Sequence, residues 1–501
     1  MKQKLQELKQ LLLEVDDLQM ATAVLYWDQT TNMPPGGAAA RGRQAATLTR
    51  LAHEKFTDPA VGKLLDALQP YADSLPYEDD DASLIRVTRR QYEKSTKIPA
   101  QLLSDFYTHS AATYQVWTKA RPANDFTVVA PYLEKTIDFS RRIADCFPGY
   151  DHIADPLIDF NDEGMKAATI RAIFADLRQQ LVPIVQAITA QEPADASCLH
   201  QSFDENKQLA FGQEIIKQYG YDLERGRQDK SPHPFTTKFN LGDVRITTRV
   251  KQNDLNEALF STLHEAGHAM YEQGINRDFD GTPLGTGTSA GVHESQSRLW
   301  ENLVGRSRGF WQHYYPKLQA AFPQQFNDAS FDTFYQAINK VSRSLIRTDA
   351  DEVTYNLHVM IRFDLELQLL EGTLAVKDLP EAWHGRYQSD LGIHAPNDSD
   401  GVLQDVHWYD GWVGGGFQGY TLGNIMSALF FDTAVQAHPD IPNQISRGQF
   451  STLHGWLKDN IYQHGSKFTA NELIQRITGG TLTIDPYIRY LRNKFGELYP
   501  L

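Results

Sequence analysis

The chain is poor in cysteine and has no long hydrophobic run. Only Cys146 and Cys198 occur among its 501 residues, and neither forms a CxxC pair or lies beside a candidate base. This usage predicts two inert thiols and argues against a disulfide-stapled secreted domain. Because no stretch of about eighteen apolar residues is present, we expect no membrane-spanning helix.

An excess of positive charge is also absent. The 48 lysines and arginines face 63 aspartates and glutamates, which gives a formal net charge of −15. Nucleic acids and anionic lipid surfaces are bound by basic footprints, so we expect neither as a partner. With 41% hydrophobic and 22% charged residues, the composition is typical of a soluble globular enzyme with a large core.

Hydrophobic residues spaced by three and four positions predict helices along most of the chain. Leu5, Leu8 and Leu12 alternate with charged residues, which is the pattern of an amphipathic helix and not of a secretory leader, so we expect a cytoplasmic protein. A second stripe, over residues 170–188, predicts one long helix despite Pro183. No repeat, low-complexity tract or long linker occurs, so residues 1–501 are expected to form one mainly α-helical domain.

The clearest strand signal lies between residues 236 and 250. β-Branched residues are frequent in residues 236–239 and 244–250, and the four residues between them have the composition of a turn, which predicts a β-hairpin. Val244, Ile246 and Thr248 would share one face, with Arg245 and Thr247 on the other. The hairpin either closes a cleft or offers an edge strand to an extended peptide.

The pentapeptide His264-Glu265-Ala266-Gly267-His268 is the most informative feature of the chain. Apolar and small residues from position 253 to 274 are spaced as in an amphipathic helix, where residues four apart lie on one face. His264 and His268 can therefore offer two imidazole nitrogens to one cation, with Glu265 beside it. Zinc lowers the pKa of water to roughly 7, so these residues could form a hydrolytic centre. The alternative is a helix whose histidines only face solvent or cap a core.

A catalytic zinc usually has three protein ligands, and the third could follow the motif. A glycine-rich loop, residues 281–291, can turn the chain back, and residues 291–302 predict a second helix. His293, Glu294 and Glu301 compete as ligands there. Glu294 is favoured because Arg298, four residues later, could orient its carboxylate, although an ordinary surface pair has the same spacing.

The pentapeptide and the segment from His293 to Asn302 resemble the M32 family of metallocarboxypeptidases, the thermostable carboxypeptidase Taq type. Other blocks agree with the family in content and order. They are Tyr26-Trp27-Asp28-Gln29 with Met33-Pro34-Pro35, His233-Pro234-Phe235, Asp243-Val244-Arg245-Ile246-Thr247, Ile346-Arg347-Thr348-Asp349-Ala350-Asp351 and Gly401-Val402-Leu403-Gln404-Asp405-Val406-His407-Trp408. The resemblance spans nearly the whole chain.

This resemblance implies a largely helical exopeptidase with a deep active-site cleft, cytoplasmic and usually homodimeric, that removes single residues from the C-termini of peptides. It implies that His264, His268 and Glu294 are the metal ligands and that Glu265 is the general base. The expected ion is zinc, although histidine and carboxylate donors also accept cobalt or manganese.

A C-terminal exopeptidase must bind a free carboxylate, and a guanidinium suits this task because it can donate two parallel hydrogen bonds. Arg347 is the first candidate, with Asp349, Asp351 and Glu352 close in sequence to hold it in place. Arg245 is the second candidate.

Further residues are expected around the substrate. Asp243 and His233, both in family-like blocks, are placed in the substrate-binding set. His407 and Tyr420 are expected to stabilise the oxyanion, where one donor is worth roughly 3 kcal/mol of barrier. Gln404 and Asp405 are expected to lie outside the reacting groups and to support either His407 or a ligand imidazole.

One stretch departs from the family pattern, which usually reads Gly-Tyr-Phe-Pro-Thr-Tyr at this point. Residues 414–420 read Gly-Gly-Gly-Phe-Gln-Gly-Tyr, one residue longer and without the first tyrosine and the proline. The extra glycines of Gly414–Gly419 predict a freer loop and looser substrate positioning.

Two alternatives for the function stay open. One is an oligopeptidase or dipeptidyl carboxypeptidase with the same chemistry, and the other is a zinc-binding scaffold without catalysis.

Overall fold

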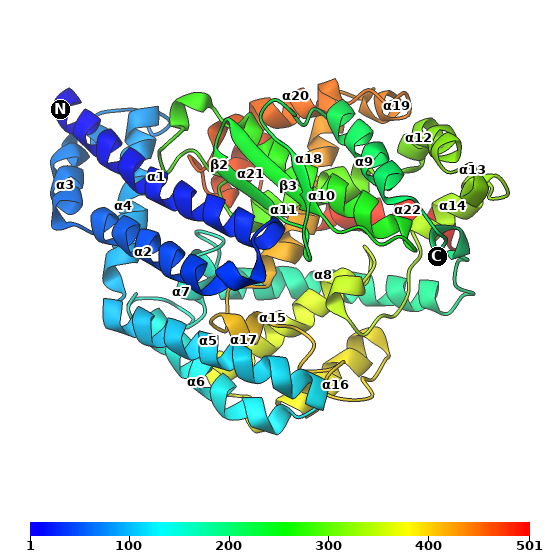
Figure 1. Ribbon diagram of the computed structural model, residues 1–501, viewed down its shortest axis with the longest axis horizontal. Coiled ribbons are helices and arrows are strands. Elements are labelled where there is room, and N and C mark those ends of the chain that lie inside the picture. Colours follow the sequence, from blue (N-terminus) through cyan, green and yellow to red (C-terminus); the bar gives the residue numbers. More distant parts are fainter. Residues whose placement is uncertain (501) are drawn as a thin grey trace.

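Helices make up most of the computed structural model, which describes residues 1–500 (Figure 1). Those of the N-terminal half are α1 (Lys2–Thr31), α2 (Ala38–Phe56), α3 (Pro59–Asp73), α4 (Asp80–Lys97), α5 (Ala100–Ala123), α6 (Phe126–Ala144), α7 (Asp155–Asp159), α8 (Ala167–Thr189) and α9 (Glu205–Tyr219). The mainly α-helical architecture expected from the hydrophobic spacing is confirmed.

The second half continues in the same way. Its helices are α10 (Leu255–Gly274), α11 (Ala290–Arg298), α12 (Arg308–Ala321), α13 (Pro323–Phe326), α14 (Phe331–Ile338), α15 (Tyr355–Glu371), α16 (Leu379–Leu391), α17 (His407–Asp410), α18 (Gln418–Ala437), α19 (Ile441–Ile445), α20 (Ser451–Asn460), α21 (Ala470–Thr478) and α22 (Asp485–Leu498). A π-helical turn, Leu299–Val304, extends α11, and short 3-10 turns include Ser197–Leu199 and Arg347–Asp349. The helix predicted over residues 291–302 therefore starts as α11 and ends in the π-helical turn.

The predicted N-terminal helix is α1, and its hydrophobic stripe is its buried face. Leu5, Leu8 and Leu12 are 6%, 0% and 3% exposed and pack in a small core with Leu65 of α3 and Ile85 of α4. Each fully buried leucine contributes roughly 1.5–3 kcal/mol to stability. The long helix predicted over residues 170–188 is α8, which contains Pro183 as expected.

The predicted hairpin is present as β2 (Thr236–Asn240) and β3 (Asp243–Thr248), which pair antiparallel. A third strand, β1 (Gln228–Lys230), runs parallel to β3 on its other side, so β3 is the central strand. The sequence Gln-Asp-Lys of β1 has no alternating hydrophobic pattern, and this strand was not predicted. Because α1 packs against β2 and α10 against β3, the sheet lies between these two helices (Figure 1).

The alternation predicted for β3 is largely confirmed. Val244, Ile246 and Thr248 are fully buried, while Arg245 is half-buried. Thr247 is buried as well, contrary to the alternation, because its hydroxyl accepts the backbone N–H of Phe235 at 2.9 Å. This bond closes the turn that leads into β2.

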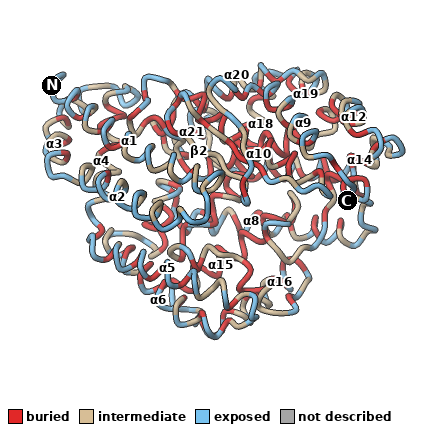
Figure 2. Tube along the Cα trace, in the orientation of Figure 1, coloured by how far each residue is buried: buried red, intermediate tan, exposed pale blue. Residues whose placement is uncertain are grey.

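The centre of the molecule is formed by α10 and α18, where Figure 2 shows buried segments gathered. Leu422, Ile425 and Met426 of α18 are fully buried, and α11 packs along this helix. A helix that is hydrophobic around its whole circumference belongs in a core. The motif helix and its neighbours are therefore held in the most buried part of the fold.

Both cysteines are free thiols, as predicted, with Cys146 half-buried and Cys198 buried. Burial raises the pKa of the Cys198 thiol to about 11. Because the thiolate is the reactive form, this thiol is inert. Among residues 1–500, no helix is both long and apolar enough to cross a bilayer.

Candidate active site

The two histidines of the pentapeptide and Glu294 converge at one point. His264 and His268 lie on α10 and Glu294 on α11, and one donor atom from each lies within 4.8 Å of the others. Glu294 Oε2 is 3.4 Å from His268 Nε2 and 3.8 Å from His264 Nε2. Two imidazole nitrogens and a carboxylate oxygen at such distances form a donor set that could hold a divalent cation.

Close approach of three helices brings these side chains together, and two glycines permit it. A Cβ added to Gly267, inside the pentapeptide, would lie 2.6 Å from the carbonyl oxygen of Gln296 on α11. A Cβ on Gly423 of α18 would lie 2.6 Å from Cβ of Glu294. Any larger residue at either position would push α11 away and separate the donors.

Hydrogen bonds behind the cluster orient the donors. His264 Nδ1 lies 2.9 Å from Glu301 Oε2, which leaves Nε2 of this ring directed at Glu294. Arg298 Nε donates to Glu294 Oε1 at 2.7 Å, so the Glu294 oxygen nearest the histidines is Oε2. Burial opposes ionisation of Glu294, but the positive charge of Arg298 outweighs it and holds the pKa of this carboxyl well below its usual range. The orienting role expected for Arg298 matches this geometry.

The other two candidates for the third ligand are occupied elsewhere. Glu301 faces the far nitrogen of His264. His293 uses its ring nitrogens for His268 Nδ1 at 2.6 Å and Glu272 Oε1 at 2.8 Å. Only Glu294 joins the two histidines in a metal-sized group among the residues described.

Glu265 is buried beside the three donors and lines the cleft that opens over them. Its Oε2 accepts the hydroxyl of Thr236 on β2 at 2.6 Å. Burial raises the pKa of Glu265, although the nearby His264 and the Thr236 hydrogen bond oppose the shift. The β-hairpin therefore holds this carboxylate in place, a contact that no pattern around Thr236 predicted.

A cleft of about 980 Å³ opens over the cluster. Its walls include residues that the sequence placed at the substrate: His233, Arg347, His407 and Tyr420. These come from the loop between β1 and β2, from the 3-10 turn before α15, and from α17 and α18. The tertiary structure thus collects them from segments far apart in the chain.

Arg347 is fixed by partners other than those expected. Its Nε donates to Asp405 Oδ2 at 2.6 Å and its Nη1 to the Tyr355 hydroxyl at 2.9 Å. The neighbouring acids Asp351 and Glu352 do not hold it. Asp351 accepts backbone N–H groups at the start of α15, and Glu352 pairs with Lys494.

Asp405 is the hub of this part of the cleft. Besides Arg347 it accepts Arg362 Nε at 2.9 Å and lies 2.5 Å from His407 Nδ1. Burial opposes ionisation, but Arg362 and the other two partners outweigh it and keep the pKa of Asp405 well below its usual range. The support expected from Asp405 for His407 matches this geometry. Arg362, which is fully buried, was not predicted, because its partners Asp405 and Gln404 lie more than 40 residues away in the sequence.

Tyr420 and His407 both line the cleft and lie next to each other. Its hydroxyl is 3.3 Å from His407 Nε2. Burial raises the pKa of Tyr420, so the hydroxyl keeps its proton and can donate it in a hydrogen bond. A ring nitrogen and a phenol therefore face the same space beside Arg347.

The glycine-rich loop before Tyr420 forms a hydrogen-bonded turn. Gly414 and Gly415 have φ angles of 98° and 80°, which other residues rarely adopt. The Gly415 carbonyl accepts side-chain N–H groups of Asn161 at 2.6 Å and Gln418 at 2.9 Å. The glycines therefore form a tight, hydrogen-bonded turn, and the looser substrate positioning stays a prediction.

Arg245 and Asp243 do not line the cleft. They pair with each other, with Arg245 Nη2 2.7 Å from Asp243 Oδ2. The Arg245 guanidinium lies 4.7 Å from the ring centre of Phe239. The structure therefore separates this pair from Arg347 and the other residues expected at the substrate.

Helix α15 also carries a buried carboxyl group, that of Glu366. Glu366 accepts the indole N–H of Trp408 at 3.0 Å. Burial raises the pKa of Glu366 to about 8, from the 4.5 of an unperturbed glutamate. Between these values the folded protein retains a proton that the unfolded chain has released, so this group makes folding less favourable as the pH rises through that window.

We expect Glu366→Gln to remove this pH dependence. The difference in free energy of unfolding between the variant and the parent protein should change in favour of the variant by about 1 kcal/mol per pH unit from pH 5 to 8. Urea unfolding at several pH values measures it, with the surface variant Glu381→Gln as control. A difference that does not change with pH would contradict the assignment.

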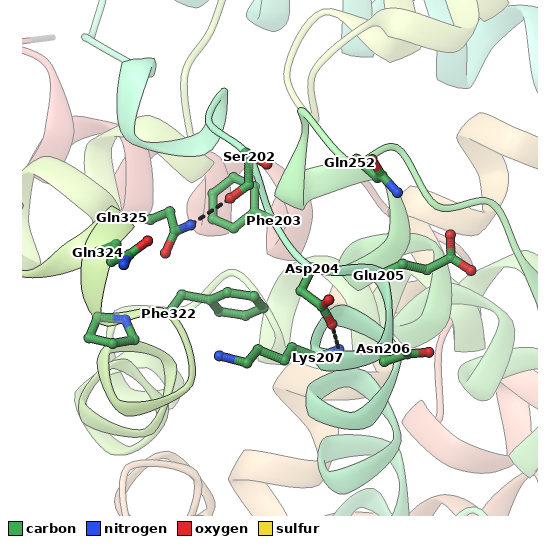
Figure 3. Close-up of a pocket in the computed structure, with 11 residues that line it drawn as sticks. Ser202, Phe203, Asp204, Glu205, Asn206, Lys207, Gln252, Phe322, Gln324 and Gln325 are labelled. Carbon is green, nitrogen blue, oxygen red and sulfur yellow. Dashed lines mark hydrogen bonds between the residues drawn. The ribbon is translucent and has the colours of Figure 1, made fainter.

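A second hollow, of about 660 Å³, lies between the start of α9 and α13 (Figure 3). Its polar side chains join neighbouring helix ends. Lys207 Nζ donates to the Ala321 carbonyl at 3.1 Å, and Gln325 Nε2 donates to the Ser202 carbonyl. Because no catalytic or metal-binding set faces this hollow among the residues described, the larger cleft is the candidate active site.

Comparisons with known proteins find relatives over nearly the whole chain. The sequence profile of the carboxypeptidase Taq (M32) metallopeptidase family matches residues 7–495. Thermostable carboxypeptidase 1 of Thermus thermophilus is 39% identical over 95% of both chains. Carboxypeptidase 1 of Bacillus subtilis is 35% identical over 98% of both.

Solved structures show the same fold. The M32 carboxypeptidase from Deinococcus radiodurans superposes with a TM-score of 0.97, at 50% identity over 100% of both chains. Metallocarboxypeptidase 1 of Trypanosoma cruzi has a TM-score of 0.92 at 29% identity, covering 99% of this chain and 100% of its own.

Proposed function

The chain belongs to the carboxypeptidase Taq (M32) metallopeptidase family and is a metal-dependent hydrolase of peptide C-termini, and we propose that His264, His268 and Glu294 hold its metal. The convergence of these three donors on one point carries the proposal. Their outer contacts support it, because each Nε2 of the histidines faces Glu294 while each Nδ1 is engaged elsewhere.

Glu265 acts as the general base in this proposal. A divalent cation bound by the three ligands would supply a Lewis acid that polarises the scissile carbonyl and acidifies water. Glu265 takes the proton of the attacking water and delivers it to the leaving amine. The Thr236 hydroxyl occupies Glu265 Oε2 and leaves Oε1 for this proton transfer.

Tyr420 and His407 stabilise the oxyanion that forms at the carbonyl. The protonated Tyr420 hydroxyl is the primary donor, and Asp405 fixes the ring of His407 beside it. Donors that are already oriented cost no reorganisation during the reaction, which is why they lower the barrier.

Arg347 binds the terminal carboxylate of the substrate and makes the enzyme release single residues. Its Nε and Nη1 are held by Asp405 and Tyr355, while Nη2 has only a 3.5 Å contact with Asp405. This leaves a rigid guanidinium with donor capacity at the cleft wall. His233 lies on the cleft wall as a further substrate contact, and Arg245 with Asp243 forms the second, more distant candidate pair.

The metal is proposed to be zinc, with cobalt or manganese as substitutes that the same donors accept. A cytoplasmic location is supported by the two free thiols. A single domain over residues 1–501 is supported by two hydrophobic cores. The larger joins residues from Ile98 to Tyr499, and the smaller joins the N-terminal helices to Leu241, Ile275 and Leu284. The homodimer remains a proposal from the family resemblance.

Timed peptide digestion followed by mass spectrometry, with and without a chelator, tests this function. We expect stepwise loss of single C-terminal residues, which stops on chelation and resumes when Zn²⁺ is added back. Release of dipeptides would favour a dipeptidyl carboxypeptidase, and internal cleavage an oligopeptidase. No cleavage by fully metal-loaded protein would favour the non-catalytic scaffold.

A further inference from the structure

A chain of partly buried hydrogen bonds leads from His268 away from the cleft. His268 Nδ1 and His293 Nδ1 are 2.6 Å apart. His293 Nε2 is 2.8 Å from Glu272 Oε1, and Glu272 Oε2 accepts Lys238 Nζ at 2.9 Å. The side chains of Glu272 and Lys238 are 7% and 16% exposed, so the chain ends in an ion pair that is largely shielded from solvent.

The partners dictate which nitrogens carry protons in this chain. The Nε2 atom of His268 faces Glu294 Oε2 at 3.4 Å and must keep its lone pair to serve as a ligand. The proton of the neutral His268 ring is then on Nδ1, which donates to His293 Nδ1. His293 carries its own proton on Nε2 and donates it to the Glu272 carboxylate.

The chain is built into the fold. Glu272 follows His264 and His268 at the same four-residue spacing on α10, so all three lie on one face. His293 reaches across from α11 and joins the last two. A Cβ on Gly287 would lie 2.6 Å from Cδ2 of the His293 ring, so packing as well as hydrogen bonding fixes this ring.

The two histidines of the pentapeptide are thus supported in different ways. His264 has a carboxylate, Glu301, directly on its Nδ1. His268 has a neutral imidazole there, and its carboxylate is one residue further away. We propose that His293 is a positioning residue that sets the tautomer and direction of His268 for metal binding, and that Glu272 and Lys238 anchor His293. This inference rests on the metal site of the proposed function.

Metal affinity measures this role directly. We expect His293→Leu to weaken Zn²⁺ binding about 10- to 100-fold in competition with a chromogenic chelator, because the Nδ1 proton of His268 loses its acceptor. His293→Gln should lose less Zn²⁺ affinity than His293→Leu, because the amide oxygen of glutamine can accept a hydrogen bond from His268 and its amide nitrogen can donate one to Glu272. Lys238→Met should also weaken binding, because it removes the cation that anchors Glu272.

Controls separate positioning from general damage. His109→Gln serves as a control, because His109 is a buried histidine on α5 that forms a hydrogen bond with Thr136 and takes no part in the metal site. The His109→Gln protein should bind Zn²⁺ like the parent protein. Thermal melting of the metal-free variants identifies any that are unfolded, and if His293→Leu is one of them, Lys238→Met decides the question. Parent-like affinity, within twofold, in folded His293→Leu or folded Lys238→Met would overturn the proposal. A parent protein that binds no Zn²⁺ would instead overturn the metal site itself.

Neutron diffraction of the metal-free protein gives an independent readout. We expect a deuteron on Nδ1 of His268 and one on Nε2 of His293. A deuteron on Nδ1 of His293, donated to an unprotonated Nδ1 of His268, would show the opposite polarity and overturn the proposal. If His293 only filled space, it would not fix which of the two facing Nδ1 atoms, that of His268 or that of His293, carries the deuteron.

Discussion

Glu265→Gln is expected to lower kcat by about 10²- to 10⁴-fold while leaving the metal bound. Glutamine has nearly the same shape and can still meet the Thr236 hydroxyl, but its amide cannot take a proton from water. Because the proposed metal ligands are His264, His268 and Glu294, and not Glu265, the metal content of the purified variant should match that of the parent protein. Steady-state hydrolysis of a short peptide, together with metal analysis of the same sample, measures both quantities.

A carboxylate elsewhere on the same helix gives the matched control. Glu257 also lies on α10 and on the cleft wall, but it is paired with Arg249 and Lys251. Glu257→Gln should retain kcat within a few-fold. If metal-loaded Glu265→Gln turns over as fast as the parent protein, Glu265 is not the base.

For Arg347→Met we expect the preference for a free C-terminus over an amidated one to collapse. The kcat/KM for the free acid should fall about a hundredfold, or ~3 kcal/mol, because a charge-assisted contact to the carboxylate is lost. The value for the amidated peptide should change little. Asp405 keeps Arg362 and His407 as partners in the variant, so the wall of the cleft should stay in place.

Paired substrates and two further variants decide where the carboxylate binds. Arg245→Met tests the second candidate, and loss of discrimination there instead of at Arg347 would move the carboxylate site away from the cleft wall. Arg447→Met changes an exposed arginine paired with Asp440 and serves as the control for losing a guanidinium. Equal cleavage of free and amidated peptides by the parent protein would remove the basis for any carboxylate site.

The local elements of the site could be predicted because they depend on neighbours in sequence. The four-residue spacing of His264 and His268 has meaning only on a helix, and α10 is confirmed over Leu255–Gly274. The β-branched runs of the hairpin are confirmed in the same way. The strand β1 was not predicted, because three polar residues pair with β3 only through a contact distant in the chain.

Longer-range partners could not be read from neighbouring residues. The acids next to Arg347 suggested its support, yet the carboxylate that holds it is Asp405, 58 residues away. The glycines near Tyr420 suggested freedom, yet the Gly415 carbonyl is bound by Asn161, 254 residues earlier. Local composition does not reveal such contacts, because folding brings them together through the packing of whole helices.

The mainly helical class, the helix that carries two imidazoles on one face, and three candidates for the third ligand all followed from the sequence. Only the packing of the helices placed one of these candidates, Glu294, beside both imidazoles. Gly267 and Gly423 let α11 and α18 approach α10 so closely that Glu294 faces the imidazoles, while His293 and Glu301 turn to their outer nitrogens. Side-chain direction at a helix crossing depends on the angle and distance between the helices, and these are properties of the packed fold.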